Sequence, residues 1–291
     1  HSSKAGAIGR ISAFLCRTSC IYTAHGWSFS MGVGKLKKMI YICMEKLLAL
    51  LCRWIVAISE FENNIALQYR ITGKNKIKLI SNGIDVNRFA PKPKKKDFMK
   101  KQLGIKENAL VIGMVGRLAP QKDPLTFVKA AKIIADSGHT AYFILVGDGE
   151  LRAEVEQKVL DLGLSDRFLI TGWVENAQDY INIFDIGVLT SQWEGFGLVL
   201  AEYMANGIPV VASNIGGIPD VILDGETGTL IPPCDTSGFA AAIINVLCDE
   251  NLKNRFIKSG FERVNSLFNI ERVAQQHHEL YVETPRSRRA D

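Results

Sequence analysis

Short apolar segments alternate with amphipathic segments along most of the second half of the chain. The apolar runs predict strands at 109–116, 141–147, 167–172, 185–191, 208–213 and 228–232. Helices are expected between and after them, at 123–138, 150–163, 176–184, 197–206 and 236–250. Strands that are apolar on both faces, each followed by a helix, are typical of a doubly wound α/β domain with a parallel sheet. Ligands of such domains bind beyond the carboxyl ends of the strands.

A shorter set of similar segments precedes this domain. Strands are predicted at 20–26, 53–59 and 76–85, with helices over 34–51 and 60–72. This pattern is typical of the second half of another α/β domain. A lysine-rich stretch at 88–101 follows and is interpreted as the linker and the start of the second domain. The last segment, 269–283, has helical periodicity.

Composition narrows the function only slightly. The net charge of +5 suits a nucleic-acid binder, a protein at an anionic membrane or an enzyme for phosphorylated substrates. The six cysteines lack zinc-ligand spacing, which favours a reducing compartment without a metal cluster. The most apolar stretch, 39–59, is interrupted by Glu45, Lys46 and Arg53 and is therefore not a bilayer span.

The loop after the strand at 109–116 carries two cations beside a helix N-terminus. Arg117 follows Gly116 at the strand end, and Lys122 precedes the expected helix cap, Asp123. Helix N-termini favour anions through their amides and their dipole. The two side chains are either solvated surface cations or a clamp for a diphosphate.

The stretch SQWEGFGLVLAEYMANG places two carboxylates beside a glycine-rich loop. Glu194 lies in the loop, and Glu202 lies in the following helix on the side that faces back toward the loop. The loop and the first helical turn offer backbone amides to a ligand, at Gly195, Phe196, Gly197 and Leu198. A buried, unpaired carboxylate is costly. Glu202 therefore either pairs with a structural cation or accepts hydrogen bonds from ligand hydroxyls, and Glu194 is either a loop-rim residue or a ligand contact.

Other signals are weaker. The sequence contains no dinucleotide fingerprint, P-loop, nucleophile elbow, zinc-protease helix or carboxylate-rich metal site. The glycine pairs 147/149 and 216/217 are explained by tight turns between strands and helices. His25 follows the strand at 20–26 and is either structural or directed into a cleft.

Taken together, these motifs resemble the retaining, nucleotide-sugar-dependent glycosyltransferases of the large group-1 family with the GT-B fold. The resemblance rests on GRLAPQK, ILVGDGELR, GWVEN and the E-x7-E pair Glu194 and Glu202, and it extends to HSSKAG, HGW, IVAISE and SNGID. It implies two Rossmann-like, doubly wound α/β domains that face a cleft, with the first one N-terminally incomplete. The first motifs are similar to those of bacterial enzymes that build surface polysaccharides on a lipid carrier.

The resemblance implies a role for each matching residue. Gly116, Arg117 and Lys122 would bind the donor diphosphate, Glu194 the transferred sugar and Glu202 the ribose. The phosphates and the base would be bound by backbone at Gly195, Phe196, Gly197 and Leu198 and at Trp173 and Val174. The acceptor side would comprise His1, Ser2, Lys4 and His25. The catalytic set would be Arg117, Lys122, Glu194 and His25, with no metal ion.

The same resemblance implies the organisation and the activity. We expect an acceptor-side domain over 1–90, a donor-binding domain over 91–262, a C-terminal helix over 263–283 that packs back toward the first domain, and a frayed tail over 284–291. The implied reaction is transfer of a sugar from a UDP-sugar to a glycan or lipid-linked acceptor, with retention and without a cofactor. The expected location is cytoplasmic, with peripheral contact to an anionic membrane through Lys35–Lys38, and no nucleic acid is involved. The alternatives are an inactive nucleotide-sugar-binding protein and a GT-B-fold epimerase.

Overall fold

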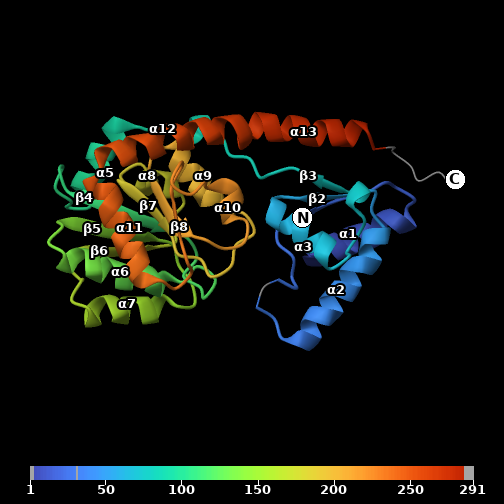
Figure 1. The fold of residues 1–291 in the computed structure, drawn as a ribbon, viewed down its shortest axis with the longest axis horizontal. Coiled ribbons are helices and arrows are strands. Elements are labelled where there is room, and N and C mark those ends of the chain that lie inside the picture. The colour runs from blue at the N-terminus through green and yellow to red at the C-terminus, as the bar shows by residue number, and fades with distance from the viewer. Residues whose placement is uncertain (1–2, 31, 285–291) are drawn as a thin grey trace. The chain divides into compact units, whose positions relative to one another are not determined.

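The computed structural model describes residues 3–30 and 32–284 (Figure 1). The chain divides into two compact units. Unit 1 consists of His1–Gly83 and Ile270–Asp291, and unit 2 of Ile84–Asn269. Unit 1 thus combines the first part of the chain with its last helix. Of the expected tail, 284–291, only residue 284 lies within the described residues.

Unit 2 contains a six-stranded parallel sheet with the order β6-β5-β4-β7-β8-β9. Its strands are β4 (Leu110–Val115), β5 (Ala141–Val146), β6 (Phe168–Gly172), β7 (Ile186–Leu189), β8 (Val210–Ser213) and β9 (Thr229–Ile231). All six predicted strands of this domain are therefore confirmed. The order is that of the dinucleotide-binding folds, and its direction reverses between β4 and β7. Ligands of such sheets bind in the crevice at this reversal.

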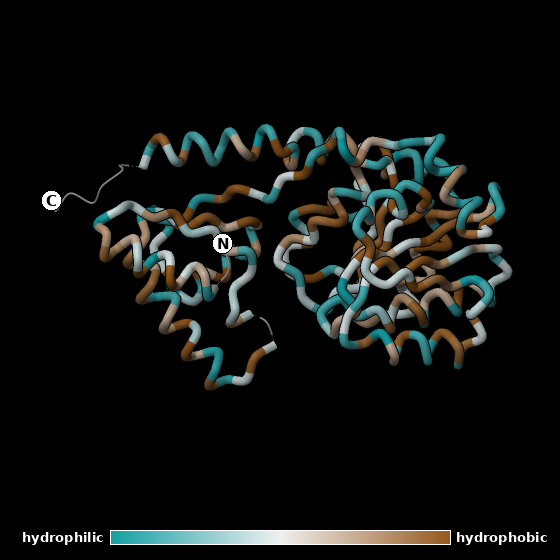
Figure 2. The backbone as a smooth tube through the Cα atoms, turned by 180° about the vertical axis from the view of Figure 1, so that it is seen from behind, coloured by the Kyte–Doolittle hydropathy of each residue, from teal (hydrophilic) through white to brown (hydrophobic). Residues whose placement is uncertain are grey.

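Helices connect the strands of unit 2 and cover its sheet (Figure 1). They are α4 (Val86–Phe89), α5 (Pro93–Gln102), α6 (Pro124–Asp136), α7 (Arg152–Asp161), α8 (Ala177–Ile181), α9 (Leu198–Ala205), α10 (Ile218–Val221), α11 (Thr236–Cys248) and α12 (Glu250–Leu267). α6 begins as expected, because Asp123 accepts a hydrogen bond from the Thr126 amide and Pro124 occupies the first turn. The apolar strands lie inside the unit (Figure 2), where Phe127, Phe143 and Phe168 pack together.

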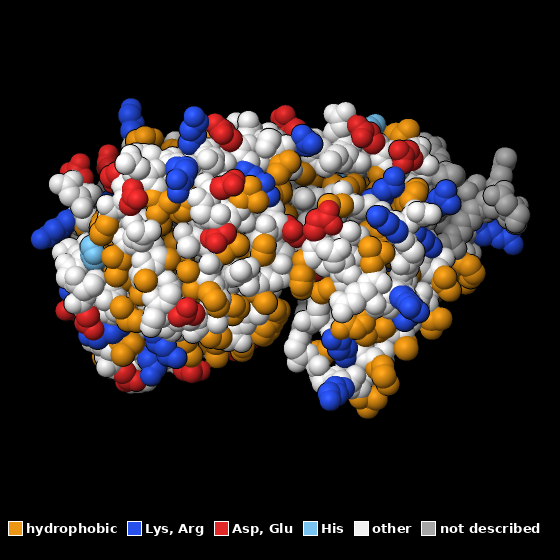
Figure 3. Space-filling view, in the orientation of Figure 1, with side chains coloured by type: hydrophobic (Ala, Val, Ile, Leu, Met, Phe, Trp, Pro, Cys, Tyr) orange, Lys and Arg blue, Asp and Glu red, His pale blue; other side chains and the backbone are white. Residues whose placement is uncertain are grey.

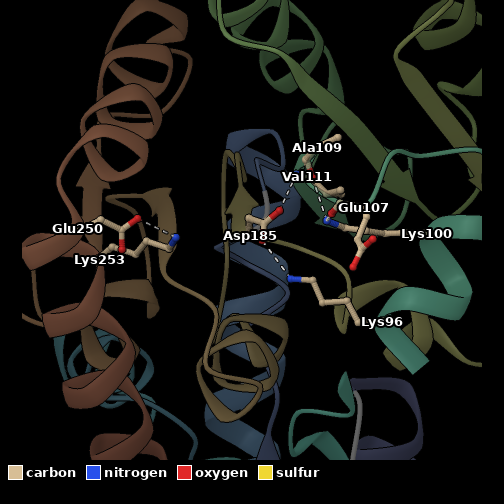
Figure 4. A network of polar contacts seen from close by, with 8 residues as sticks. All are labelled: Lys96, Lys100, Glu107, Ala109, Val111, Asp185, Glu250 and Lys253. Atoms are coloured by element: carbon tan, nitrogen blue, oxygen red, sulfur yellow. Dashed lines mark hydrogen bonds and ion pairs between the residues drawn. The ribbon is translucent and has the colours of Figure 1, made fainter. Parts of the chain in front are cut away.

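The lysine-rich stretch is helical and belongs to unit 2. Lys100 is buried, and its ammonium donates to the carbonyls of Glu107 and Ala109, each at 2.9 Å (Figure 4). Lys96 forms an ion pair with Asp185 at 3.1 Å. These partners lie on other segments of the unit, so the lysines fix α5 in place. Our interpretation of 88–101 as a linker and the start of a domain thus omitted this helix.

Unit 1 contains a parallel sheet in the order β1-β2-β3. Its elements are α1 (Ser3–Leu15), β1 (Ile21–Ala24), α2 (Lys35–Leu50), β2 (Trp54–Ala57), α3 (Glu60–Gln68), a 3₁₀ turn (Lys74–Lys76), β3 (Ile77–Leu79) and α13 (Ile270–Val282). α13 packs through Val273 and Leu280 against Val56 of β2 and Ile80. Within the described ranges, no helix combines the length and the apolar character needed to cross a membrane.

Candidate active site

Two loops meet where the strand order of unit 2 reverses. One follows β4, and the other follows β7. The Thr190 hydroxyl lies 2.9 Å from the Lys122 carbonyl and 2.8 Å from the Asp123 carbonyl. The Gln192 amide donates to the Gln121 carbonyl at 2.8 Å. These backbone-directed bonds hold the two loops in a fixed register at the carboxyl edge of the sheet.

The centre of this site is the contact between Lys122 and Glu194. The Lys122 ammonium is hydrogen bonded to the Glu194 carboxylate, and the two side chains are only 19% and 13% exposed. The Ser191 hydroxyl donates to the same carboxylate at 3.3 Å. Gly116 lies beside the lysine stem, since a Cβ there would be in ordinary van der Waals contact with Lys122 Cγ, at 3.4 Å. The sequence predicted Gly116, Lys122 and Glu194, but it did not single out Ser191.

A glycine pair after β8 holds the Glu194 loop. The Gly217 amide donates to the Glu194 carbonyl at 2.9 Å. Gly216 has φ +59°, and a Cβ on it would lie 2.0 Å from the same carbonyl oxygen. The pair is therefore more than a tight turn, because its backbone touches the backbone of a predicted site residue. The sequence could show the glycines but not this contact.

Replacing Gly216 by alanine should displace the Glu194 loop. The clash is with backbone atoms, so no side-chain rotation can relieve it. We therefore expect the sugar transfer that the motifs imply to fall by about tenfold to a hundredfold, a loss that misplaced groups commonly cause. Gly225→Ala is the matched control, because Gly225 has φ +73° and open space around its Cβ position. Both variants carry the strain of a positive φ, of about 1–2 kcal/mol. Equal transfer rates in the two variants would show that the contact with Glu194 is unimportant.

The first turn of α9 lies directly after this loop. Gly197 caps the helix with φ +83°. The amides of Phe196, Gly197 and Leu198 donate to no residue that the structure describes. The Phe196 side chain is buried against Phe268, with ring centroids 5.3 Å apart. Its side chain thus anchors the turn, while the backbone donors remain available to an anion.

Arg117 does not take part in the contact between Lys122 and Glu194. Its side chain is 72% exposed and pairs with Glu150 at 3.1 Å. Exposed pairs of this kind contribute at most about 1 kcal/mol, so the guanidinium can exchange this partner for another anion. Trp173 and Val174 follow β6 directly, and Trp173 is 77% exposed.

Glu202 lies on α9, within electrostatic range of Arg88 on α4. Burial raises the pKa of its carboxyl, and the positive charge of Arg88 opposes this shift. Among the described residues, the carboxylate accepts no hydrogen bond and forms no ion pair. A structural ion pair, one of the two interpretations of Glu202, is thus not formed, and its hydrogen-bonding capacity remains available.

The predicted acceptor-side residues belong to unit 1. His25 follows β1, and partial burial lowers the pKa of its imidazole, with a smaller effect from His277. Lys4 is exposed on α1. His1 and Ser2 lie outside the described residues. Nowhere in residues 3–30 and 32–284 do three His, Cys, Asp or Glu side chains gather as metal ligands would.

We expect Thr190→Val to weaken the site without changing its charge. Valine has nearly the same shape but leaves the buried Lys122 and Asp123 carbonyls without this donor, which costs about 1–3 kcal/mol. The predicted result is a higher KM for the sugar donor and a lower urea midpoint. Thr190→Ser retains the hydroxyl and should behave like the wild type. A normal KM for Thr190→Val would contradict a positioning role.

Comparisons with known proteins identify the family to which the chain belongs. The family model described as glycosyl transferases group 1 matches residues 95–263. A UDP-Gal:alpha-D-GlcNAc-diphosphoundecaprenol alpha-1,3-galactosyltransferase from Escherichia coli is 33% identical over 97% of this chain and 74% of its own. A capsular polysaccharide biosynthesis glycosyltransferase from Staphylococcus aureus is 28% identical over 96% and 74%. Among solved structures, Anabaena HepE in complex with UDP superposes with a TM-score of 0.89 at 24% identity, over 97% of this chain and 77% of its own.

The family model covers more than half of the chain, and the likeness to the E. coli enzyme covers nearly all of it. The structural likeness adds the fold, which agrees with the parallel sheets of both units. The expected GT-B architecture is thereby confirmed. The chain belongs to the glycosyl transferases group 1, and its fold is that of the GT-B glycosyltransferases.

Proposed function

We propose that the protein transfers a sugar from a UDP-sugar to a hydroxyl of a lipid-linked glycan during the synthesis of a bacterial surface polysaccharide. The transfer retains the anomeric configuration and needs no metal ion. The observation that carries this proposal is the Lys122–Glu194 contact beside the amides of the first turn of α9. In this proposal unit 2 binds the donor, and unit 1 provides the acceptor side.

Lys122 and the first turn of α9 bind the donor diphosphate. An ammonium has three N–H donors, so Lys122 can contact a phosphate oxygen without releasing Glu194. The amides of Phe196, Gly197 and Leu198 donate to the phosphates at the positive end of the helix dipole. Arg117 exchanges Glu150 for the diphosphate. These groups then stabilise the negative charge that develops as the sugar–phosphate bond breaks.

The two glutamates bind the hydroxyls of the donor. Glu194 is held by Lys122 and Ser191 and uses its remaining acceptor positions for the transferred sugar. Glu202 accepts hydrogen bonds from the ribose diol, which replace the solvation that its burial removes. The backbone at Trp173 and Val174 contacts the base.

Transfer follows a front-face course. The acceptor oxygen bonds to the anomeric carbon on the face from which the phosphate leaves, and its proton passes to a phosphate oxygen of the departing UDP. In this proposal, as the sequence motifs imply, His25 acts at the reacting sugar, and His1, Ser2 and Lys4 belong to the acceptor side. The name of the E. coli relative supports both substrates, since it specifies UDP-Gal as donor and a diphosphoundecaprenol-linked GlcNAc as acceptor. A lipid acceptor favours a cytoplasmic protein in peripheral contact with an anionic membrane.

The proposal is tested by incubating the chain with a panel of nucleotide sugars and a diphosphoundecaprenol-linked GlcNAc acceptor, with and without EDTA. We expect transfer from one UDP-sugar, unchanged by EDTA, with the anomeric configuration of the donor retained in the product by NMR. A product of inverted configuration would overturn the retaining mechanism, and loss of transfer in EDTA would overturn the metal-independent one. Binding of UDP-sugar without any transfer would instead favour an inactive binding protein, and conversion of the free UDP-sugar an epimerase.

A further inference from the structure

The outward face of α2 is apolar along the whole helix. Its exposed side chains include Leu36, Met39, Ile40, Met44, Leu47 and Leu50, each between 47% and 71% exposed. Their spacing of three and four residues places them on one side of a helix, within an arc of about 140° at 3.6 residues per turn. The opposite side of α2 packs into unit 1 through Glu45, Leu48 and Ala49. A surface helix ordinarily has one apolar face, whereas α2 has two.

Lysines flank the outward face on both sides. At 3.6 residues per turn, Lys35 and Lys46 border one edge of the apolar arc and Lys37 the other. All three are exposed. Lys38 lies on the core side, with its ammonium 4.8 Å from the centre of the Tyr69 ring. The basic cluster Lys35–Lys38 therefore divides into two outward lysines and one that packs within the unit. Apolar side chains bordered by lysines are the pattern of helices that lie in a membrane interface.

The charge around α2 indicates what covers this face. Residues 1–59 contain eight basic residues, Lys4, Arg10, Arg17, Lys35, Lys37, Lys38, Lys46 and Arg53. They contain one acidic residue, Glu45, which is buried in an ion pair with Arg10 at 2.9 Å. Orange and blue side chains gather over α2 in Figure 3. A second copy of the chain would bring the same positive charge against this face. A partner surface that is both apolar and anionic is complementary to this face in charge and in apolar character.

We propose that α2 lies in the interface of an anionic lipid bilayer, with its apolar arc among the acyl chains and Lys35, Lys37 and Lys46 at the headgroups. This deepens the proposed function, because it names the membrane surface at which a lipid-linked acceptor would be met. Binding depends on insertion as well as charge. The ion pair between Glu45 and Arg10 fixes the inner side of α2 to α1. The outer side is therefore a preformed surface.

The proposal is tested by co-sedimentation of the chain with vesicles of phosphatidylcholine alone or with 30% phosphatidylglycerol, with unfolding monitored by circular dichroism. We expect binding to the anionic vesicles only. The combined substitution of Leu36, Met39 and Leu47 by glutamine should lower the partition coefficient at least tenfold, since each removes apolar area from the bilayer. Replacing Lys35, Lys37 and Lys46 by glutamine should lower it by about fivefold per lysine.

The matched control is glutamine at Phe98 and Leu160, two equally exposed apolar residues of unit 2. This control should bind vesicles like the wild type. Equal binding of the α2 variant and the control, or no binding by the wild type, would overturn the proposal. An α2 variant that binds normally but elutes as a smaller species would assign the face to self-association. Vesicle binding is measured without donor or acceptor, so its outcome is independent of sugar transfer.

Discussion

Replacing Lys122 by alanine is expected to slow sugar transfer by about 10²–10³-fold, the range found when one stabilising donor is removed from a developing oxyanion. The side chain is largely buried beside Glu194, so its loss removes the cation at the leaving phosphate and leaves that carboxylate with Ser191 alone. Two negative groups would then face each other when a diphosphate binds. The measurement is the kcat of transfer at saturating donor, with folding checked by circular dichroism.

Two variants separate this role from the general effect of a lost charge. Lys132→Ala removes a surface lysine of α6 that pairs with Asp136 at 2.7 Å, and it should leave kcat unchanged. Lys122→Arg keeps the charge but changes its geometry, and it should retain part of the activity. A kcat of Lys122→Ala within twofold of the wild type would remove Lys122 from the catalytic set.

Glu62→Gln is expected to stabilise the protein at pH 8 by up to about 3 to 4 kcal/mol. Glu62 is buried in unit 1, and its carboxylate accepts a hydrogen bond from the Trp27 amide at 3.2 Å. Burial raises the pKa of this carboxyl from 4.5 to about 7, against the opposing effect of that hydrogen bond. Glutamine keeps an oxygen that can accept from Trp27, but it carries no charge to bury.

The sign of the pH dependence follows from the raised pKa. The folded protein binds the Glu62 proton up to about pH 7, whereas the unfolded chain releases it near 4.5, so the wild type loses stability between these values as the pH rises. Each pKa unit corresponds to about 1.4 kcal/mol, which sets an upper limit of about 3 to 4 kcal/mol. Urea unfolding at pH 4.5 and pH 8 should show a difference between variant and wild type only at the higher pH. Glu60→Gln, at an exposed neighbour, is the control, and an equal effect there would contradict the assignment.

The strands could be predicted from the sequence because their apolar runs are buried on both sides. β4, β5, β7 and β8 fall where continuous apolar segments end at polar or glycine residues. Helices whose stability depends on distant partners were missed. α1 contains two glycines, and it depends on Gly6 fitting against the Tyr22 ring and on Arg10 pairing with Glu45. α12 was missed as a separate helix, and it packs through Gly260 against Met204 of α9.

In the candidate site, too, the features with local sequence signals could be predicted, and those that depend on distant contacts could not. Glu194 and Lys122 stand beside glycines and helix starts, which are local signals, so both could be singled out from the sequence. The contact between their side chains, and the bonds from Thr190 and Gly217 that position their loops, join segments that the fold alone brings together. The partner of Arg117 also depends on tertiary structure, because its guanidinium forms an ion pair with Glu150, which lies on the loop after β5. Local sequence thus identified the groups but not the bonds that position them.

The central claim is that Lys122, Glu194 and the first turn of α9 bind the diphosphate of the donor. The most direct test is isothermal titration of the full chain with UDP, without acceptor, for the wild type, Lys122→Ala and Lys132→Ala. We predict binding to the wild type and to Lys132→Ala with the same Kd, and a Kd at least tenfold higher for Lys122→Ala, as expected for a lost hydrogen bond between charged groups of about 1.5–3 kcal/mol. Equal UDP affinity in all three proteins would contradict the claim.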